Sequence, residues 1–239
     1  MTTPLLADIE LARMDYEAIW DSATSEERTD MATFLSSVLP QEWIYSYSDV
    51  SPQKHNIHVI PVDNLSYLWD LSYELVTKGE IPRDKYCDDR VVAAHGVSAK
   101  AQKPRNDSRL RGYSTGPIGF VPESSNATKT DKGHLVGHSL GGTLDLNIIP
   151  QMRSVNRGGE WRKMEKYCAA NPGTYFFCRP LYLGYSRHPA EIEFGILMPD
   201  DSLWLRSFKN YRDFDELRAI EIAWLEKLKS IAAEEAEAP

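Results

Sequence analysis

Four polar residues between positions 134 and 165 have the chemistry to cut a phosphodiester bond. They are His134, Asn147, Asn156 and Glu165. Hydrolysis of this bond needs a base that activates water and a cation that holds the scissile phosphate. The imidazole of His134 can be the base because it changes protonation near neutral pH. The amide oxygen of Asn156 suits Mg²⁺, which prefers oxygen ligands and keeps several waters. We therefore expect a nuclease that uses Mg²⁺, with Mn²⁺ as a substitute.

Each of these residues is a weak indicator when it is taken singly. A lone histidine is more often structural than catalytic, and asparagines favour turns and helix caps. Glu165 gains significance from its place nine residues after Asn156 on a predicted helix, where it could hold a metal-bound water. The combination of residue types and spacings carries the nuclease hypothesis.

The same stretch contains a competing motif around Ser139. Residues 137–142 read Gly-His-Ser-Leu-Gly-Gly, which matches the nucleophile elbow of lipases. That elbow needs a buried strand before the serine and an apolar helix after it. Here residues 129–134 are strongly charged, and residues 143–150 look like a strand that ends at Pro150. Since only His188 lies downstream as a partner, we keep a serine hydrolase as the weaker alternative.

Taken together, the motifs resemble those of the DNA/RNA non-specific endonuclease family, the ββα-metal or His-Me finger nucleases. The matching segments are Asp-Lys-Gly-His at 131–134, Asn-Ile-Ile-Pro-Gln at 147–151 and Asn-Arg-Gly at 156–158, followed by Trp161 and Glu165. The resemblance is firm over about 131–167 and fainter over 101–130 and 174–199. It implies an α+β fold with a ββα-metal core and a mixed or antiparallel sheet.

The resemblance also implies roles for individual residues. His134 would be the general base and Asn156 the direct metal ligand, while Asn147 would orient the base or the substrate phosphate. Glu165 would hold a metal-bound water. The family further uses an arginine about thirty residues before the histidine to stabilise transition-state charge. The candidates for that arginine are Arg105, which fits best, Arg109 and Arg111.

Three basic residues near the motif are expected to contact substrate phosphates: Lys132, Arg153 and Arg157. The alternative for the two arginines is an ordinary solvated helix face. Lys132 stands where the family usually has arginine, so a point charge replaces a forked donor.

The spacing between Asn156 and Trp161 is one residue longer than usual. If the extra residue lies within a helix, it rotates Glu165 by about 100° relative to Asn156. Glu160 is then a rival for the role of holding a metal-bound water.

We divide the chain into three parts. Residues 1–88 form a mostly helical region, with apolar stripes over 5–20 and from Met31 to a helix end at Pro40. A short strand is expected at 57–62. A helix capped by Asp63 or Asn64 would place its leucines inward and stop at Gly79.

Residues 89–210 form the predicted nuclease domain. We expect a loop-rich segment over 101–129, a helix over 156–169 and strands at 175–183, 191–198 and 203–208. Residues 211–239 form an acidic C-terminal helix that packs on or flanks this domain.

The charge is unevenly spread along the chain. The net charge is −8, yet residues 99–190 contain 14 Lys and Arg against 6 Asp and Glu. A basic middle between acidic ends fits a phosphate-binding site and DNA, with RNA as a further substrate. The three cysteines have no metal-ligand spacing and suit a reduced compartment.

The N-terminal residues and the hydropathy bear on the location of the protein. We find no apolar run of about 18 residues and therefore expect no membrane insertion. The first eight residues lack the basic start of a signal peptide. We expect a protein that is cytoplasmic at synthesis and exported without a cleavable signal, as an effector or toxin with a cognate inhibitor (immunity) protein. The alternative is a catalytically weak, nuclease-like binding module.

Overall fold

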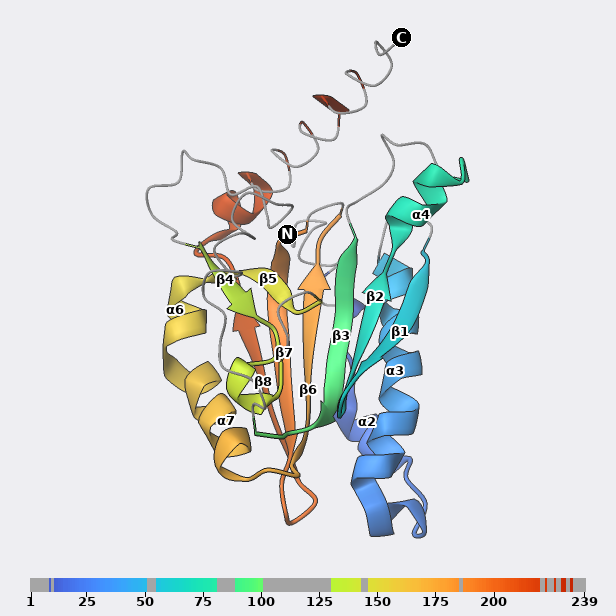
Figure 1. The fold of residues 1–239 in the computed structure, drawn as a ribbon, viewed down its shortest axis with the longest axis vertical. Coiled ribbons are helices and arrows are strands. Elements are labelled where there is room, and N and C mark those ends of the chain that lie inside the picture. The colour runs from blue at the N-terminus through green and yellow to red at the C-terminus, as the bar shows by residue number, and fades with distance from the viewer. Residues whose placement is uncertain are drawn as a thin grey trace.

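The computed structural model describes residues 9, 11–50, 55–80, 89–100, 130–142, 146–184 and 187–219, together with positions 222, 226, 229, 230 and 233. Within these ranges the chain forms two sheets and the helices that pack on them (Figure 1). The predicted loop-rich segment 101–129 lies outside the described residues.

A six-stranded sheet runs through the molecule, and each neighbouring pair of its strands is antiparallel. Its order in space is β1 (Ile57–Val62), β2 (Leu65–Asp70), β3 (Arg90–Val97), β6 (Tyr175–Tyr182), β7 (Pro189–Leu197) and β8 (Leu203–Lys209). The predicted α+β class is confirmed, and the sheet is antiparallel rather than mixed. Because β2 pairs with β3, the sheet crosses the boundary predicted at residue 88.

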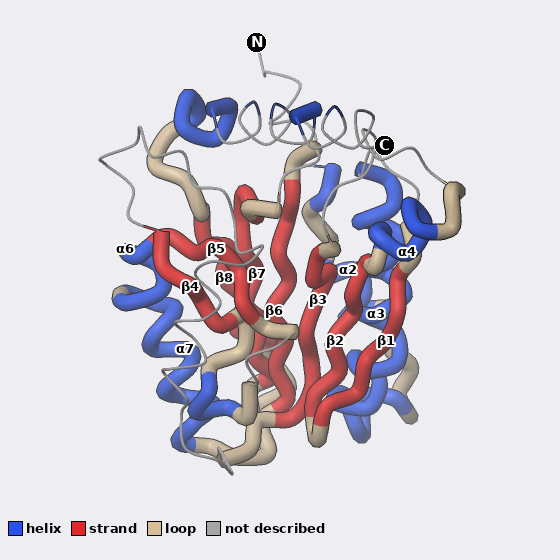
Figure 2. Tube along the Cα trace, turned by 45° about the horizontal axis from the view of Figure 1, so that its top comes forward, coloured by secondary structure: helices blue, strands red, loops and turns tan. Residues whose placement is uncertain are grey.

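A separate two-stranded hairpin carries the motif residues. It consists of β4 (Thr130–His134) and β5 (Ile148–Met152), joined through the short turn η3 (His138–Leu140). Two helices, α6 (Arg153–Arg157) and α7 (Gly159–Ala170), follow at once. Strand, strand and helix thus follow one another in the predicted ββα order, and Figures 1 and 2 show the hairpin and α7 beside strands β6 to β8.

Two hydrophobic clusters lie on opposite faces of the six-stranded sheet. Trp43, from helix α3 (Met31–Val50), packs with Phe177 in one cluster. Trp161 and Met164 of α7 pack with Phe176 in the other. Phe176 and Phe177 enter different clusters because successive side chains of a strand point to opposite faces. The sheet therefore separates the N-terminal helices from the hairpin.

The three strands predicted after residue 170 are confirmed as β6, β7 and β8. Ile192, Phe194 and Ile196 alternate along β7 and are all buried in the cluster shared with α7. The predicted helix over 156–169 corresponds to two helices, α6 and α7, separated at Gly158.

The helix expected between a cap at Asp63 or Asn64 and a stop at Gly79 is wrong over its first part. Asp63 has a φ of 55° and, with Asn64, forms the turn that joins β1 to β2. Residues Leu65–Asp70 then form β2, and only Ser72–Thr77 form a helix, α4. The leucine spacing misled because β2 is buried on both faces: Leu65 and Leu68 enter different clusters, as sheet residues can.

The predicted helix end at Pro40 is also wrong. Helix α3 continues through Pro40 to Val50. Leu39 and Trp43, on either side of the proline, are fully buried. Their packing on the sheet keeps the helix continuous although proline lacks the N–H that a helix interior uses. In the same way, the apolar run expected to end at Pro150 continues as β5 to Met152.

The ends of the chain follow the predictions in part. The stripe over 5–20 is interrupted at 13–15, where Asp15 caps the short helix α2 (Tyr16–Asp21) by accepting from Ala18 N. A 3-10 turn, η1 (Glu27–Asp30), leads into α3. Residues 214–219 are helical and Leu217 is buried, while most of the predicted C-terminal helix lies outside the described residues.

Candidate functional site

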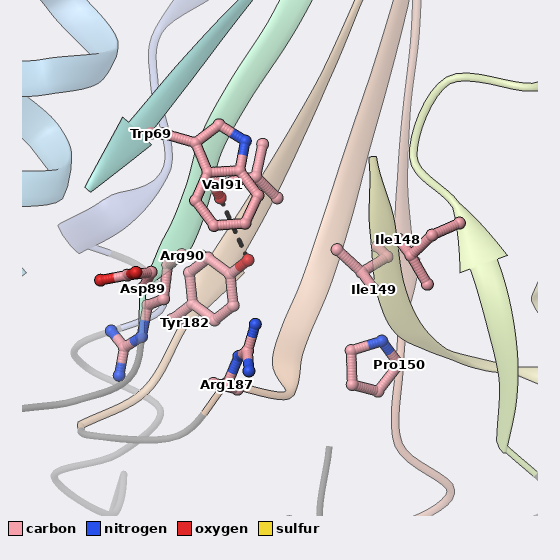
Figure 3. A pocket seen from close by; sticks show the side chains of 9 residues that line it. All are labelled: Trp69, Asp89, Arg90, Val91, Ile148, Ile149, Pro150, Tyr182 and Arg187. Atoms are coloured by element: carbon pink, nitrogen blue, oxygen red, sulfur yellow. Dashed lines mark hydrogen bonds between the residues drawn. The ribbon is translucent and has the colours of Figure 1, made fainter. Parts of the chain in front are cut away.

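His134 is the last residue of β4 and is half-buried. It pairs with Ile148 of β5 in an antiparallel register, so the two side chains leave the hairpin on the same face. Ile149 points to the opposite face, toward a small pocket that Trp69 and Tyr182 also line (Figure 3). Ile148 and Pro150 line this pocket as well, so β5 forms one of its walls.

Asp131 joins the strand that ends at His134 to helix α6. Its carboxylate accepts hydrogen bonds from Nε of Arg153 at 3.0 Å, from Nε and Nη2 of Arg157 at 2.6 and 3.0 Å, and from Nδ2 of Asn156 at 3.2 Å. Partial burial opposes ionisation, but the hydrogen bonds from these three side chains outweigh it and lower the pKa of Asp131. Asp131 therefore holds the local geometry by bridging β4 and α6.

Asn156 uses only half of its amide in this bridge. Because its nitrogen donates to Asp131, the amide oxygen is the atom of the side chain that suits a cation. The residue is half-buried, at the fourth position of α6. A hard cation such as Mg²⁺ takes oxygen ligands and keeps waters, so this amide oxygen fits it.

Glu165, on helix α7, contacts the loop that follows His134. Its side chain is 7% exposed and accepts from Nη1 of Arg162 at 2.7 Å. A Cβ placed on Gly137 would lie 2.6 Å from Oε1 of Glu165, so this carboxylate packs directly on Gly137. Burial raises the pKa of Glu165, and Arg162 only partly opposes the shift. In the sequence, His134 thus lies between Asp131, which bonds to α6, and Gly137, which packs against Glu165 of α7.

Asn147 fixes the chain that leaves His134. It is fully buried, its Oδ1 accepts from Val136 N at 2.7 Å, and its Nδ2 donates to Val136 O at 2.7 Å. Leu135 N also donates to the carbonyl of Asn147 at 2.8 Å. Asn147 holds the backbone two residues after His134 by hydrogen bonds, and through this backbone it could orient the imidazole, as predicted.

The comparison with protein families decides the class of protein. A model of the DNA/RNA non-specific endonuclease family matches residues 77–196, half of the chain. The chain belongs to this family. The predicted resemblance is confirmed, and the protein is a nuclease of this family.

Two solved structures are similar to the nuclease. One is an extracellular endonuclease with 12% sequence identity, covering 69% of this chain and 84% of that chain at a TM-score of 0.34. The other is the Sda1 nuclease with a bound zinc ion, with 18% identity, covering 65% of this chain and 75% of that chain at a TM-score of 0.33. No curated protein matches the chain in sequence.

The extra residue between Asn156 and Trp161 of the nuclease falls at the junction between helices α6 and α7. Helix α6 ends at Arg157, Gly158 is extended, and Gly159 has a φ of 59° at the start of α7. The expected rotation of Glu165 within one continuous helix is therefore replaced by a break at the two glycines. A left-handed residue at this break favours glycine.

Glu160, the rival of Glu165, is placed differently. Its side chain is 40% exposed and forms an ion pair with Lys163 on the surface of α7. Glu165 is the glutamate that contacts the loop after His134. The geometry therefore favours Glu165 over Glu160 as a residue of the site.

The lipase-like motif has a packing explanation. Ser139 is exposed in the turn η3 and does not lie between a buried strand and a helix. A Cβ on Gly142 would lie 1.9 Å from Val136 O and 2.8 Å from Nδ2 of Asn147. Gly142 and Gly137 are thus needed for the close approach of Asn147 and Glu165. His188, the partner that a serine mechanism would need, is buried beside Asn210.

The three predicted phosphate contacts lie on two adjoining elements. Lys132 is half-buried in β4, two residues before His134. Arg153 and Arg157 on α6 have side chains that are 41% and 61% exposed although both pair with Asp131. Each guanidinium therefore still presents N–H groups to solvent. The arginine candidates Arg105, Arg109 and Arg111 lie outside the described residues.

Clustered metal ligands and membrane spans are both absent from the described residues. Over these residues, no three His, Cys, Asp or Glu side chains gather as a group that could hold a metal ion. None of the helices in the described part of the chain combines the length and the hydropathy needed to cross a membrane. Cys168 and Cys178 are buried and free.

Proposed function

We propose that the nuclease is a divalent-metal-dependent endonuclease that cleaves DNA, and RNA as a further substrate, with little sequence preference. The observation that carries the proposal is the bridge from Asp131 to Asn156, Arg153 and Arg157. It joins an amide that has an oxygen suited to a cation, and two partly exposed guanidinium groups, to the strand that ends in His134.

His134 would take the proton from the attacking water. A neutral imidazole accepts a proton near pH 7, and the strand pairing with Ile148 and the contacts of Asn147 restrict the backbone that carries it. The water oxygen attacks the phosphorus, the bond from phosphorus to the 3′ oxygen breaks, and the product has a 5′-phosphate.

Asn156 would hold the cation through its amide oxygen, and Glu165 would anchor a water of the hydration shell. Mg²⁺, with Mn²⁺ as a substitute, would stabilise the charge that develops on the phosphate. Lys132, Arg153 and Arg157 would hold substrate phosphates as charged hydrogen-bond donors. Arg105, or its rivals Arg109 and Arg111, would add positive charge in the transition state.

The deciding test is nicking of supercoiled plasmid by wild type and His134→Ala, each with Mg²⁺ and with EDTA. We expect wild type to nick only with metal, and His134→Ala to be slower by about 10²–10⁴-fold, as for loss of a general base. Measurement of circular dichroism confirms that the variant is folded. Intact plasmid and RNA in every lane, or hydrolysis of acyl esters instead, would contradict the proposal.

We further propose a role as an exported effector or toxin that a cognate inhibitor protein holds in check in the producing cell. An active nuclease endangers the nucleic acid of the cell that makes it. Expression of wild type without an inhibitor should therefore stop growth, while expression of His134→Ala should not. Normal growth with measurable nuclease activity in the lysate would count against this role.

A further inference from the structure

Asn210 is a buried asparagine that joins the hairpin to the six-stranded sheet. Its side chain has no exposed surface. Oδ1 accepts from Met152 N at 2.7 Å, while Nδ2 donates to Pro150 O and to Pro189 O, each at 2.9 Å. The two β5 residues are about sixty positions away in the sequence, so this connection exists only in the folded chain.

The amide of Asn210 takes the place of a third strand beside β5. Strand β5 is paired on one side only, with β4. Alternate residues of an antiparallel strand direct their N–H and C=O away from the partner strand. Pro150 O and Met152 N are separated by one such step, and Asn210 satisfies both with one acceptor and one donor. Only a side-chain amide offers both groups in this geometry.

Asn210 is itself held by β7. Its backbone N donates to Ala190 O at 2.8 Å, and its carbonyl lies 2.8 Å from Nε2 of His188. Since a carbonyl oxygen can only accept, Nε2 of His188 is the donor. Both residues are buried. Because Asn210 bonds to β7 and to β5, it fixes the position of β5 relative to the large sheet.

The end of β5 held by Asn210 is the start of α6. Met152 occupies the position before Arg153, and no side chain caps the helix there. Asn156, Arg153 and Arg157 follow within one and a half turns and all bond to Asp131. A shift of Met152 would therefore move the residues assigned to the cation and to phosphate relative to β4.

We propose that Asn210 is a positioning residue for the nuclease reaction, acting through Met152 to set where α6 begins relative to His134. It does not touch the nucleic acid. The inference rests on the proposed function, because Asn156 and the two arginines have their roles there.

The test compares wild type with Asn210→Ala, with His188→Gln as a milder variant and Asn171→Ala as a control. Asn171 is an exposed asparagine at the far end of α7 whose amide donates to Tyr167 O at 2.8 Å. Below the unfolding temperature, Asn210→Ala should lower kcat by about 10- to 100-fold, as outer partners of a metal site do, with KM for DNA within about two-fold. Asn171→Ala should keep wild-type kcat.

Two readouts separate positioning from a general loss of stability. Calorimetric titration with Mn²⁺ should show weaker binding by Asn210→Ala. Hydrogen exchange should be faster at residues 151–157 and unchanged in β6 and β7. If Asn210→Ala does not fold, His188→Gln should show a smaller loss of kcat with the same local exchange.

Each other outcome is decisive. Wild-type kcat in folded Asn210→Ala, or in His188→Gln when the first variant is unfolded, would overturn the role. Faster exchange throughout the molecule would also overturn it, because Asn210 would then be a stability residue only. An inactive wild type would refute the proposed function itself, and the parallel His134→Ala sample identifies that case.

Discussion

Asn147 and Asn156 carry the same amide but use it differently. Asn147 is fully buried, and both its amide oxygen and its amide nitrogen form hydrogen bonds with the backbone of Val136. Asn156 is half-buried, and its amide nitrogen donates a hydrogen bond to Asp131. Asn147 is therefore suited to holding the loop after His134, and Asn156 is suited to holding a ligand through its oxygen. Residue type and spacing alone did not separate these two uses.

Replacing Asn147 by aspartate tests its structural role. The introduced carboxylate would still accept from Val136 N but would place its second oxygen against Val136 O. We expect the free energy of unfolding to fall by about 1–3 kcal/mol, the cost of unsatisfied buried groups. Plasmid cleavage should also slow, because the backbone next to His134 is no longer held. Urea unfolding and a nicking assay on the folded fraction measure both effects.

The matched control for this change is Asn171→Asp, at an exposed asparagine. Because water can solvate the carboxylate at this exposed site, the free energy of unfolding should fall by no more than about 0.5 kcal/mol, and plasmid cleavage should not change. Full stability of Asn147→Asp would show that the two hydrogen bonds to Val136 are not needed to hold the loop.

At the scale of elements, the break between α6 and α7 explains how the nuclease tolerates an extra residue. Gly158 is extended and Gly159 is left-handed, so the two helices are separate units. Asp131 anchors α6, while Trp161 and Met164 bury α7 in the core. Because each helix has its own attachment, their relative rotation is set by packing and not by helical periodicity.

Helix α3 offers an element-scale prediction at Pro40. Proline has no N–H to donate to the carbonyl of Ser36, which costs about 3 kcal/mol in a helix interior. Pro40→Ala should therefore raise the free energy of unfolding by about 1–3 kcal/mol and the Tm by several degrees. Cleavage should not change, because α3 packs on the face of the sheet opposite the hairpin.

Thermal unfolding of Pro40→Ala and of Pro61→Ala tests this prediction. Pro61 lies in the edge strand β1, so the change in Tm of Pro61→Ala measures the effect of removing a proline that is not in a helix. A lower Tm for Pro40→Ala would mean that the proline ring contributes more through packing than the missing hydrogen bond costs.

At the scale of the whole molecule, Asp70 ties the N-terminal helices to the sheet. Its carboxylate has no exposed surface and accepts from Tyr47 Oη at 2.8 Å, Ser72 Oγ at 2.6 Å and Asn56 N at 2.9 Å. His55 Nδ1 lies 3.7 Å away. Burial by itself would raise the pKa of Asp70, but His55 and the three hydrogen bonds outweigh it and lower the pKa to about 2.

This lowered pKa predicts how stability depends on pH. A carboxylate with a pKa near 3.9 when unfolded and about 2 when folded stabilises the folded state above pH 4. The contribution, about 2 kcal/mol, is lost as pH falls from about 4 toward 2. The difference in free energy of unfolding between wild type and Asp70→Asn should shrink by this amount over that range.

Urea unfolding at several pH values measures the difference, with Asp49→Asn, at an exposed aspartate of α3, as the control. Wild type and Asp49→Asn should lose stability in parallel. A difference between wild type and Asp70→Asn that is the same at pH 5 and at pH 2.5 would contradict the assignment.

Local pattern was enough to predict several parts of the nuclease. The alternation of Ile192, Phe194 and Ile196 predicted β7, and the spaced motif from Asp131 to Glu165 predicted the family and the ββα order. These features depend on neighbours within a few residues or on spacings along one chain segment. Such information is present in the sequence before the chain folds.

The tertiary structure decided what depends on contacts between distant segments. Residues Leu65–Asp70 form a strand because β1 and β3 pair with it on both sides, and α3 passes Pro40 because the sheet buries Leu39 and Trp43. Asn210 showed no pattern in the sequence, since its partners Pro150 and Met152 lie about sixty residues away. Hydrogen bonds across such separations form only when the whole core has assembled, and no local periodicity encodes them.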